Sequence, residues 1–337
     1  MLRTTTRLAE PSRCLHRWYS SAVDRHDVPP KAPFLRTLYC DIHDVPVDKF
    51  RELAFLPETP IRIAPPQNGE ERSKWQAGFP ERWWSRDDST SRLPDGSLLP
   101  SQEYLSQFAD TILPYEVILD MKKEPLPKIS SAQDEISQVI ATLLERSPDA
   151  TFHRFNAPLS LFLQACKSSP PLERLYIAQA QIADLPKQLQ DDLPVPTIVQ
   201  KAGKGDIYDA NIWMGTPPTY TPLHKDPNPN LFVQLASQKV VRLFEPNVGS
   251  RIFRDVQEKI GQHASSIFRG DEMMEGPERE ALDEAVWNKK IRMECFEVTV
   301  APGEAIFIPK GWWHSIKSKG RGMNHILKIS MAIGSSP

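Results

Sequence analysis

The sequence TPLHKD at residues 221–226 and the sequence IPKGWWH at residues 308–314 decide how this chain is interpreted. In a β-strand alternate side chains share one face, so we expect His224 and Asp226 to point the same way. His314 follows a strand-like run and can bring a third ligand from elsewhere in the fold. Two histidines and one carboxylate on one face of an octahedral metal leave three positions open, as in non-haem Fe(II) oxygenases. The pattern therefore indicates a mononuclear iron site.

The His-x-Asp motif by itself is weak, because a chain of this length with eight histidines is expected to contain about one such triplet by chance. The neighbouring sequence strengthens it. The runs Asn230 to Gln234 and Lys239 to Pro246 follow the motif in a fixed order.

The run from Trp213 to Pro246, with the run from Pro302 to Ile316, resembles the JmjC, or cupin-like, Fe(II)/2-oxoglutarate oxygenases. It is most similar to the small JmjC hydroxylases. The resemblance extends upstream through Tyr176 to Gln179 and covers residue 152 to about residue 334. It implies a mainly β fold with flanking helices, built on a double-stranded β-helix of the jelly-roll type.

The resemblance implies that His224, Asp226 and His314 are the metal ligands and form the catalytic centre. It also implies Fe(II) as the metal, 2-oxoglutarate as co-substrate and O2 as oxidant. 2-Oxoglutarate chelates iron through its keto-acid end, so charged and hydroxyl groups are needed at its far end to fix its orientation.

Four residues match the family's positions for the co-substrate. Lys239 matches the basic residue that pairs with the distal carboxylate, and Thr221 and Tyr176 match hydroxyl groups that bind the same carboxylate. Asn230 matches a polar residue near metal and co-substrate. From the residues alone, Thr221 between prolines can be a turn residue, Lys239 an edge lysine and Tyr176 a core side chain.

Two departures from the family pattern stand out. Many relatives carry an asparagine on the last barrel strand, where this chain reads Leu327 to Ile333 without one. Position 225 is Lys, and its side chain is expected to face away from the metal. Trp312 and Trp313 are expected to pack around the barrel mouth. Five other histidines show no partner at ligand spacing and are assigned to surface or core roles: His26, His43, His153, His263 and His325.

The first residues differ sharply in composition from the rest of the chain. Four arginines lie among serines and threonines with only Glu10 as an acidic residue, a composition typical of a mitochondrial transit peptide. An arginine just before a Trp-Tyr pair predicts cleavage after Tyr19 and a matrix location. The alternatives are a basic N-terminus without targeting function, which Pro11 favours by interrupting the helix, and a cytoplasmic protein.

The composition is that of an ordinary globular chain with a formal net charge of −2 at pH 7. No run of eighteen apolar residues occurs, so no membrane span is predicted. Loss of the basic N-terminus would leave a more acidic protein, which argues against avid nucleic-acid binding. The four cysteines are far apart, so neither a zinc knuckle nor a disulfide framework is indicated, and a reducing compartment is consistent.

We predict a presequence over residues 1–19, an α/β flanking region over 34–170 and the cupin-like core over 171–335. Helices are expected over Val47 to Phe55 and from Ser130 to about Leu144. The charged insertion from Gly249 to Lys290 is expected to be helical at Pro277 to Lys289, either shaping substrate entry or decorating the surface.

The function predicted from these features is a 2-oxoglutarate-dependent hydroxylase whose substrate is a protein side chain. The alternatives are an oxygenase acting on a small molecule or a tRNA base, and a cupin-like binding protein without turnover. The sequence leaves the oligomeric state and the identity of the substrate open.

Overall fold

The computed structural model describes residues 34–66, 81–84, 99–119, 135–148, 150–167, 172, 174–205, 207–261, 274–288, 294–319 and 324–331. The expected presequence at residues 1–19 and the expected helix start at Ser130 lie outside the described residues. So do the side chains of the last strand, where the family's asparagine is missing.

The described strands form a nine-stranded sheet and a four-stranded sheet. In spatial order the large sheet contains β1 (Arg36–Tyr39), β2 (Ile61–Ala64), β11 (Ala305–Ile308), β8 (Asn230–Ala236), β13 (Asn324–Met331), β6 (Ile207–Gly215), β5 (Leu175–Gln181), β3 (Ile112–Ile118) and β4 (Phe152–Pro158). The small sheet contains β10 (Phe296–Val300), β9 (Gln238–Phe244), β12 (Trp313–Lys319) and β7 (Tyr220–Lys225). Except for β1 with β2, the pairings are antiparallel.

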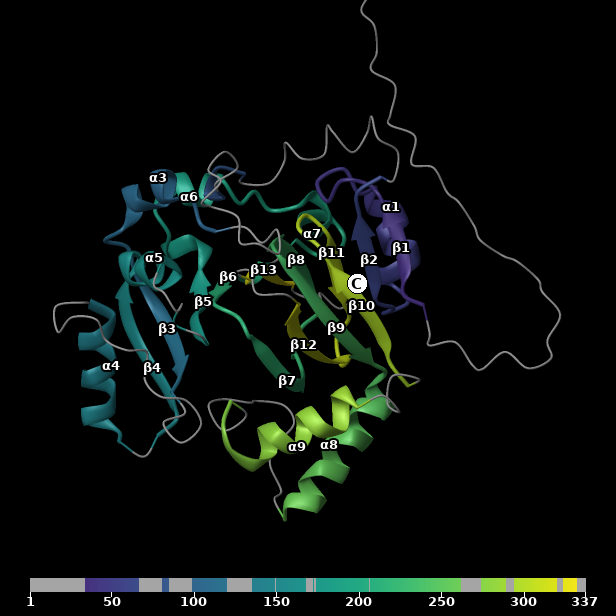
Figure 1. Cartoon of the computed structure of the whole chain (residues 1–337). Helices are drawn as coiled ribbons and strands as arrows, with labels where there is room; N and C mark the ends of the chain where they lie inside the picture. Colours follow the sequence, from purple (N-terminus) through teal and green to yellow (C-terminus); the bar gives the residue numbers. More distant parts are fainter. Residues whose placement is uncertain are drawn as a thin grey trace, which may run out of the picture.

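From β6 onward the chain crosses repeatedly between the two sheets, which is the course of a double-stranded β-helix (Figure 1). The sheets share a core of aliphatic and aromatic side chains from both: Phe232, Val241, Leu243, Val298, Val300, Ile306, Ile308, Trp312 and Ile316. The expected mainly β fold with flanking helices is confirmed. Two sheets that close on each other can hold a site between their inner faces.

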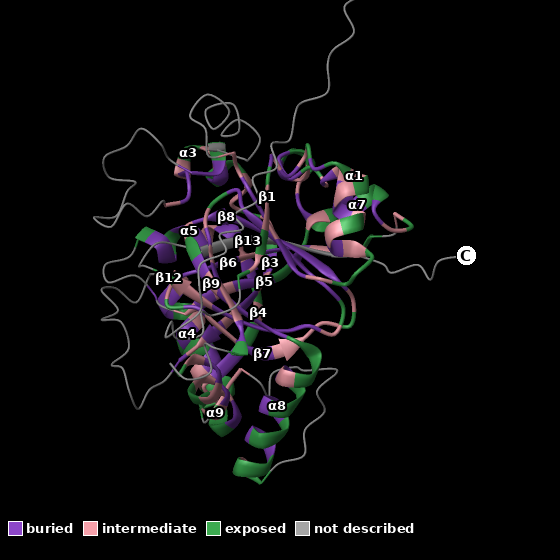
Figure 2. Ribbon diagram, turned by 90° about the vertical axis from the view of Figure 1, so that its right-hand side faces the viewer, coloured by how far each residue is buried: buried purple, intermediate pink, exposed green. Residues whose placement is uncertain are grey.

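The flanking region over residues 34–170 contributes strands β1 to β4 to the large sheet, so it extends the sheet that carries the core. Its helices pack on the outside (Figure 1), and burial concentrates where the strands meet (Figure 2). In α4 (Glu135–Arg146) the buried residues include Ile136, Ile140 and Leu143, the face expected from their spacing. The shorter helical segments are α1 (Val47–Phe50) with η1 (Arg51–Phe55), η2 (Glu81–Trp83), α3 (Gln102–Leu105), η3 (Ser106–Phe108), α5 (Leu159–Lys167), η4 (Ile182–Asp184), α6 (Lys187–Asp191) and α7 (Thr197–Lys201).

The insertion between β9 and β10 forms two helices that lie together beneath the small sheet (Figure 1). The predicted helix is confirmed as α9 (Gly276–Trp287). The helix α8 (Pro246–Ile260) was not predicted, although Pro246 lies at its first turn and Ile252, Phe253 and Val256 form its buried face. Among the described helices, none is long and apolar enough to cross a membrane.

Candidate active site

A β-bulge in β7 brings Thr221 and His224 to the same face of the small sheet. His224 lies opposite His314 of β12 and Thr221 lies opposite Ile316, so two residues of β7 span one residue of β12. An extra residue in one strand re-aims the side chains that follow it. Because His314 and Ile316 share a face, Thr221 and His224 share it too, and all four line one cavity.

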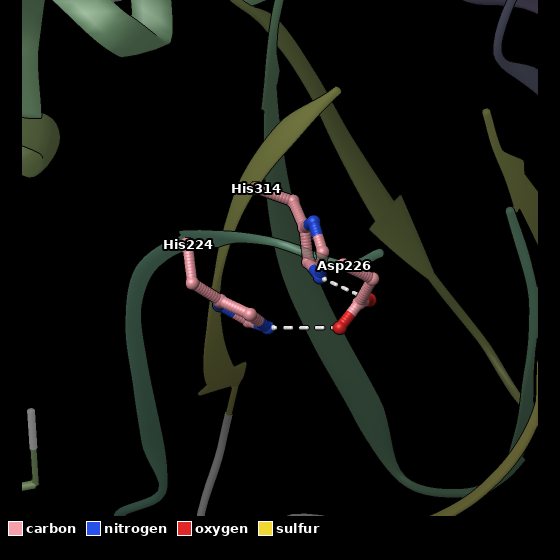
Figure 3. Close-up of side chains that lie close together, drawn as sticks. All are labelled: His224, Asp226 and His314. Carbon is pink, nitrogen blue, oxygen red and sulfur yellow. Dashed lines mark ion pairs between the residues drawn. The ribbon is translucent and has the colours of Figure 1, made fainter. Parts of the chain in front are cut away.

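His224, Asp226 and His314 converge as the sequence predicts (Figure 3). Their candidate ligand atoms all lie within 4.8 Å of one another. The His224 Nε2 is 3.8 Å from one carboxylate oxygen of Asp226, and the His314 Nε2 is 3.4 Å from the other. Within the part of the chain that the structure describes, this is the one cluster of three His, Cys, Asp or Glu residues able to hold a metal.

Backbone carbonyl groups orient both imidazole rings. The Nδ1 of His224 is 2.9 Å from the carbonyl oxygen of Pro222, and the Nδ1 of His314 is 3.5 Å from that of Trp312. A carbonyl oxygen only accepts, so the contact at His224 favours a proton on Nδ1 and a lone pair on Nε2, whereas the contact at His314 is long for a hydrogen bond. The side-chain amide of Asn230, which is fully buried, donates to Asp226. The donor set therefore fits a divalent metal, with Asn230 holding the carboxylate ligand.

The triad opens into a cavity of about 520 Å³ between the sheets. This volume lies in the range of sites that hold small molecules or side chains, roughly 300–1,000 Å³. The cavity is lined by the triad and by Thr221, Tyr176 and Asn230, from both sheets. The structure thus brings six of the seven predicted site residues around one space.

The seventh predicted residue, Lys239, lies directly behind Tyr176. Its ammonium nitrogen is 2.8 Å from the Tyr176 hydroxyl oxygen, and the residue is 1% exposed. Among the described residues it makes no ion pair with a carboxylate, and burial lowers the pKa of Lys239 to about 7. A buried amine without an acidic partner suits an anionic ligand, so the site fits the distal carboxylate of 2-oxoglutarate.

Burial also raises the pKa of Tyr176, so its hydroxyl stays protonated and can donate. The roles of Lys239, Tyr176, Thr221 and Asn230 toward the co-substrate stay predictions. Lys225 borders the cavity, but its ammonium lies 5.3 Å from the ring centre of Trp313, the residue before His314. Trp312 and Trp313 are both buried, in agreement with packing roles.

Several residues of the cavity wall were not singled out from the sequence. Gln179 lines the cavity next to a register shift in β5, and Arg174 lies just before that strand. Arg279 reaches the cavity from α9. The only sequence signal for Arg279 was its place in the charged insertion, because nothing in a sequence fixes which helical face meets a distant strand.

A family model described as a cupin-like domain matches residues 124–333. The chain belongs to the cupin-like family. This cupin-like chain is 28% identical to Lysine-specific demethylase JMJ30 of Arabidopsis thaliana over 161 residues, which are 47% of the chain and 35% of that relative. It is 27% identical to Lysine-specific demethylase 8 of Danio rerio over 145 residues, 42% of the chain and 33% of the relative. It is also 27% identical to JmjC domain-containing protein D of Dictyostelium discoideum over 153 residues, 42% of the chain and 32% of the relative.

The JmjC resemblance expected from the sequence is thereby confirmed. The matched region spans about a third of the length of these curated relatives.

Proposed function

We propose that this cupin-like protein is an Fe(II)- and 2-oxoglutarate-dependent oxygenase that hydroxylates a side chain of a protein. The observation that carries the proposal is that one cavity is lined by a His/Asp/His cluster and by Tyr176, whose hydroxyl contacts the buried ammonium of Lys239, a lysine without a carboxylate partner among the described residues. The first feature suits Fe(II) and the second suits the far end of a dicarboxylic acid. The family membership and the JmjC names of the relatives support the same reading.

His224, Asp226 and His314 would hold the metal, and their fixed orientation removes the cost of arranging ligands at binding. Bound Fe(II), with 2-oxoglutarate and O2, supplies a reaction in which one oxygen atom enters the substrate C–H bond and the other enters succinate as CO2 is released. Lys239 and Tyr176 would bind the distal carboxylate, with Thr221 as a further hydroxyl donor. The apolar core beside the cavity, including Phe232 and Ile308, excludes water from this end.

Succinate formation tests the proposal. The purified full chain with Fe(II), ascorbate and 2-oxoglutarate should release succinate slowly without added substrate, and His224→Ala should abolish this release. His43→Ala, a histidine outside the cavity, serves as the matched control and should leave it unchanged. Succinate no higher in the wild type than in His224→Ala would assign the chain to the class of cupin-like binding proteins without turnover.

The substrate class is tested separately. The relatives' names include lysine-specific demethylases, which are proteins said to act on a protein side chain, and this favours a protein substrate for the present chain. A proteome-wide search for +16 Da modifications that disappear in a deletion strain should identify hydroxylated residues. Loss of a methyl group with formaldehyde release would instead indicate demethylation, and a change in a tRNA base or a metabolite would indicate the alternative substrates.

We further propose a mitochondrial matrix location, supported by the arginine-rich, acid-poor composition of residues 1–19. A fusion carrying a fluorescent protein at the C-terminus should colocalise with mitochondria, and deletion of residues 1–19 should disperse it. Diffuse cytosolic signal from the full fusion would overturn this location.

A further inference from the structure

The strand β5 carries a β-bulge where it borders the cavity. Its register on the neighbouring strand β6 (Figure 1) shifts between Ile177 and Ala180, so that Ala178 and Gln179 together lie opposite Trp213. These three bulge residues all line the cavity. Bulges re-aim side chains and are frequent beside active sites. The bulge therefore presents residues of the large sheet to the cavity that holds the metal triad.

Gln179 occupies this bulge in a left-handed backbone conformation, with a φ of 56°. That conformation costs free energy for any residue with a Cβ, whereas glycine adopts it without this cost. Backbone strain of this kind persists where the surrounding structure holds it in place, and it concentrates at functional sites. The presence of glutamine in place of glycine indicates that the side chain at this position has a task.

The task of the Gln179 side chain is not to stabilise the fold. The residue is exposed, and its carboxamide makes no hydrogen bond to any of the residues that the structure describes. Tyr176 on the same strand differs, because its hydroxyl contacts the ammonium of Lys239. Residues three apart on a regular strand face opposite sides, but the bulge brings Gln179 to the cavity that Tyr176 also lines. The Gln179 carboxamide is therefore available to a ligand in this cavity.

The chemistry of a carboxamide narrows the choice of ligand. It carries an acceptor oxygen and an NH2 donor, so it can form two hydrogen bonds with another neutral amide. The main-chain peptide group offers the same pair of atoms at almost every residue of a protein. A carboxamide at the wall of this cavity can hence hold the main chain beside a side chain that enters the cavity.

We propose that Gln179 is a specificity residue of the oxygenase, and that its carboxamide pairs with a main-chain peptide group next to the target residue of the protein substrate. This inference rests on the proposed function and deepens it, because it names the group by which a protein substrate is held. The side-chain amide of an Asn or Gln in the substrate offers the same chemistry, and the experiments below separate the two sources.

Hydroxylation in cells tests the role of Gln179. A deletion strain is complemented with the wild-type chain, with Gln179→Gly or with Glu58→Gly, and the +16 Da modification is quantified at every protein site that the wild type restores. Initial restoration should be about tenfold slower with Gln179→Gly, as expected for the loss of paired hydrogen bonds to substrate. Glu58→Gly is the matched control and should act as the wild type, because Glu58 has a φ of 50° and is exposed but lies outside the cavity.

A synthetic peptide that carries the most strongly restored site gives the rate constants. With the Fe(II)-loaded full chain, kcat/KM for its hydroxylation should fall about tenfold in Gln179→Gly. Gln179→Asn should recover part of this loss, because asparagine keeps the carboxamide and tolerates the left-handed conformation. Wild-type protein that does not hydroxylate the peptide would overturn recognition through a local main-chain group.

Modified peptides identify the partner of Gln179. Each main-chain amide within two residues of the target is N-methylated in turn, and one of these changes should lower kcat/KM about tenfold with the wild type but cause no further loss with Gln179→Gly. Losses that multiply for every N-methylated peptide would overturn main-chain pairing. Replacement of an Asn or Gln side chain in the peptide that shows this coupling would assign the contact to a side-chain amide.

Two measurements separate recognition of substrate from folding and from binding of 2-oxoglutarate. The melting temperature of Gln179→Gly should equal or exceed that of the wild type, because glycine relieves the left-handed strain. A lower melting temperature would show that the side chain supports the fold and would overturn the assignment. Calorimetry on the Mn(II)-saturated variant should find 2-oxoglutarate bound as in the wild type, and a tenfold weaker affinity would assign Gln179 to the co-substrate instead.

Failure of this inference differs from failure of the proposed function. Sites that the wild type and Gln179→Gly restore equally would refute the role of Gln179 and leave the oxygenase function intact. A wild type that restores no protein site would reject hydroxylation of a protein, and the role of Gln179 with it.

Discussion

Binding of 2-oxoglutarate should take up a proton, because the amine of Lys239 is mostly neutral when the protein is free. Burial lowers the pKa of Lys239 to about 7, so at pH 8 about one tenth of the free protein carries the ammonium. The co-substrate's carboxylate favours the ammonium and raises this pKa again in the complex. The complex therefore holds about 0.9 more protons than the free protein at pH 8.

The same linkage fixes how affinity changes with pH. Well below pH 7 Lys239 is charged in both the free protein and the complex, so this group adds no pH dependence there. Above pH 7 the free protein must take up a proton to bind, so affinity falls. Between pH 7 and pH 9 the charged fraction drops from about one half to about one hundredth, which predicts a dissociation constant about fifty-fold higher.

Isothermal titration calorimetry of 2-oxoglutarate into the Mn(II)-saturated protein measures both quantities. Titrations at pH 8 in HEPES and in Tris, whose ionisation enthalpies differ, give the number of protons taken up. Lys239→Arg is the matched control, since a guanidinium stays charged throughout this range and should bind with almost no proton uptake. Proton uptake near zero in the wild type, or the same loss of affinity from pH 7 to pH 9 in Lys239→Arg, would refute the reasoning.

Three further substitutions test the framework around the site. Gly215→Ala should weaken 2-oxoglutarate binding about tenfold or more, because an added Cβ would collide with the Tyr176 ring. Calorimetry should find this loss of affinity in a variant that still folds, and an unchanged dissociation constant would contradict the predicted role of the Tyr176 ring. Asn230→Ala should lower metal affinity roughly 10- to 100-fold, because it releases the Asp226 carboxylate. A competition titration with a chelating dye measures this affinity, and an unaltered value would show that the Asn230 amide does not hold the carboxylate in place. Trp313→Ala should reduce the free energy of unfolding by about 3–5 kcal/mol in urea denaturation, since this buried ring of β12 packs against Phe253 of α8. A loss below about 1 kcal/mol would show that the surroundings close over the space.

Strand alternation predicted that His224 and Asp226 share a face, and the resemblance to the JmjC oxygenases was needed to add His314 as the third ligand. The bulge in β7 was not predictable, since it depends on how β7 pairs with β12. Without that bulge Thr221 would point away from the metal, so its presence in the cavity follows from pairing rather than from spacing.

Helices could be predicted from the sequence only where a capping residue or a clear apolar periodicity marked them. The helix α8 was overlooked because its apolar residues are separated by charged ones and its apolar face is narrow. The contact between Lys239 and Tyr176 joins the small sheet to the large one, and the sequence carries no signal that two such distant residues touch. Family resemblance pointed to both residues, whereas their mutual hydrogen bond required the folded chain.

The helices α8 and α9 form one continuous insertion that rests on the same small sheet that carries the metal ligands. The residues that would hold the metal and the cavity-wall residue Arg279 therefore lie in separate stretches of the chain. Exchange of the segment between β9 and β10 can replace Arg279 and its surroundings while β7 and β12 keep their sequence. One wall of the cavity could therefore change in evolution, or be exchanged by a protein engineer, while the candidate metal ligands keep their sequence and their strands.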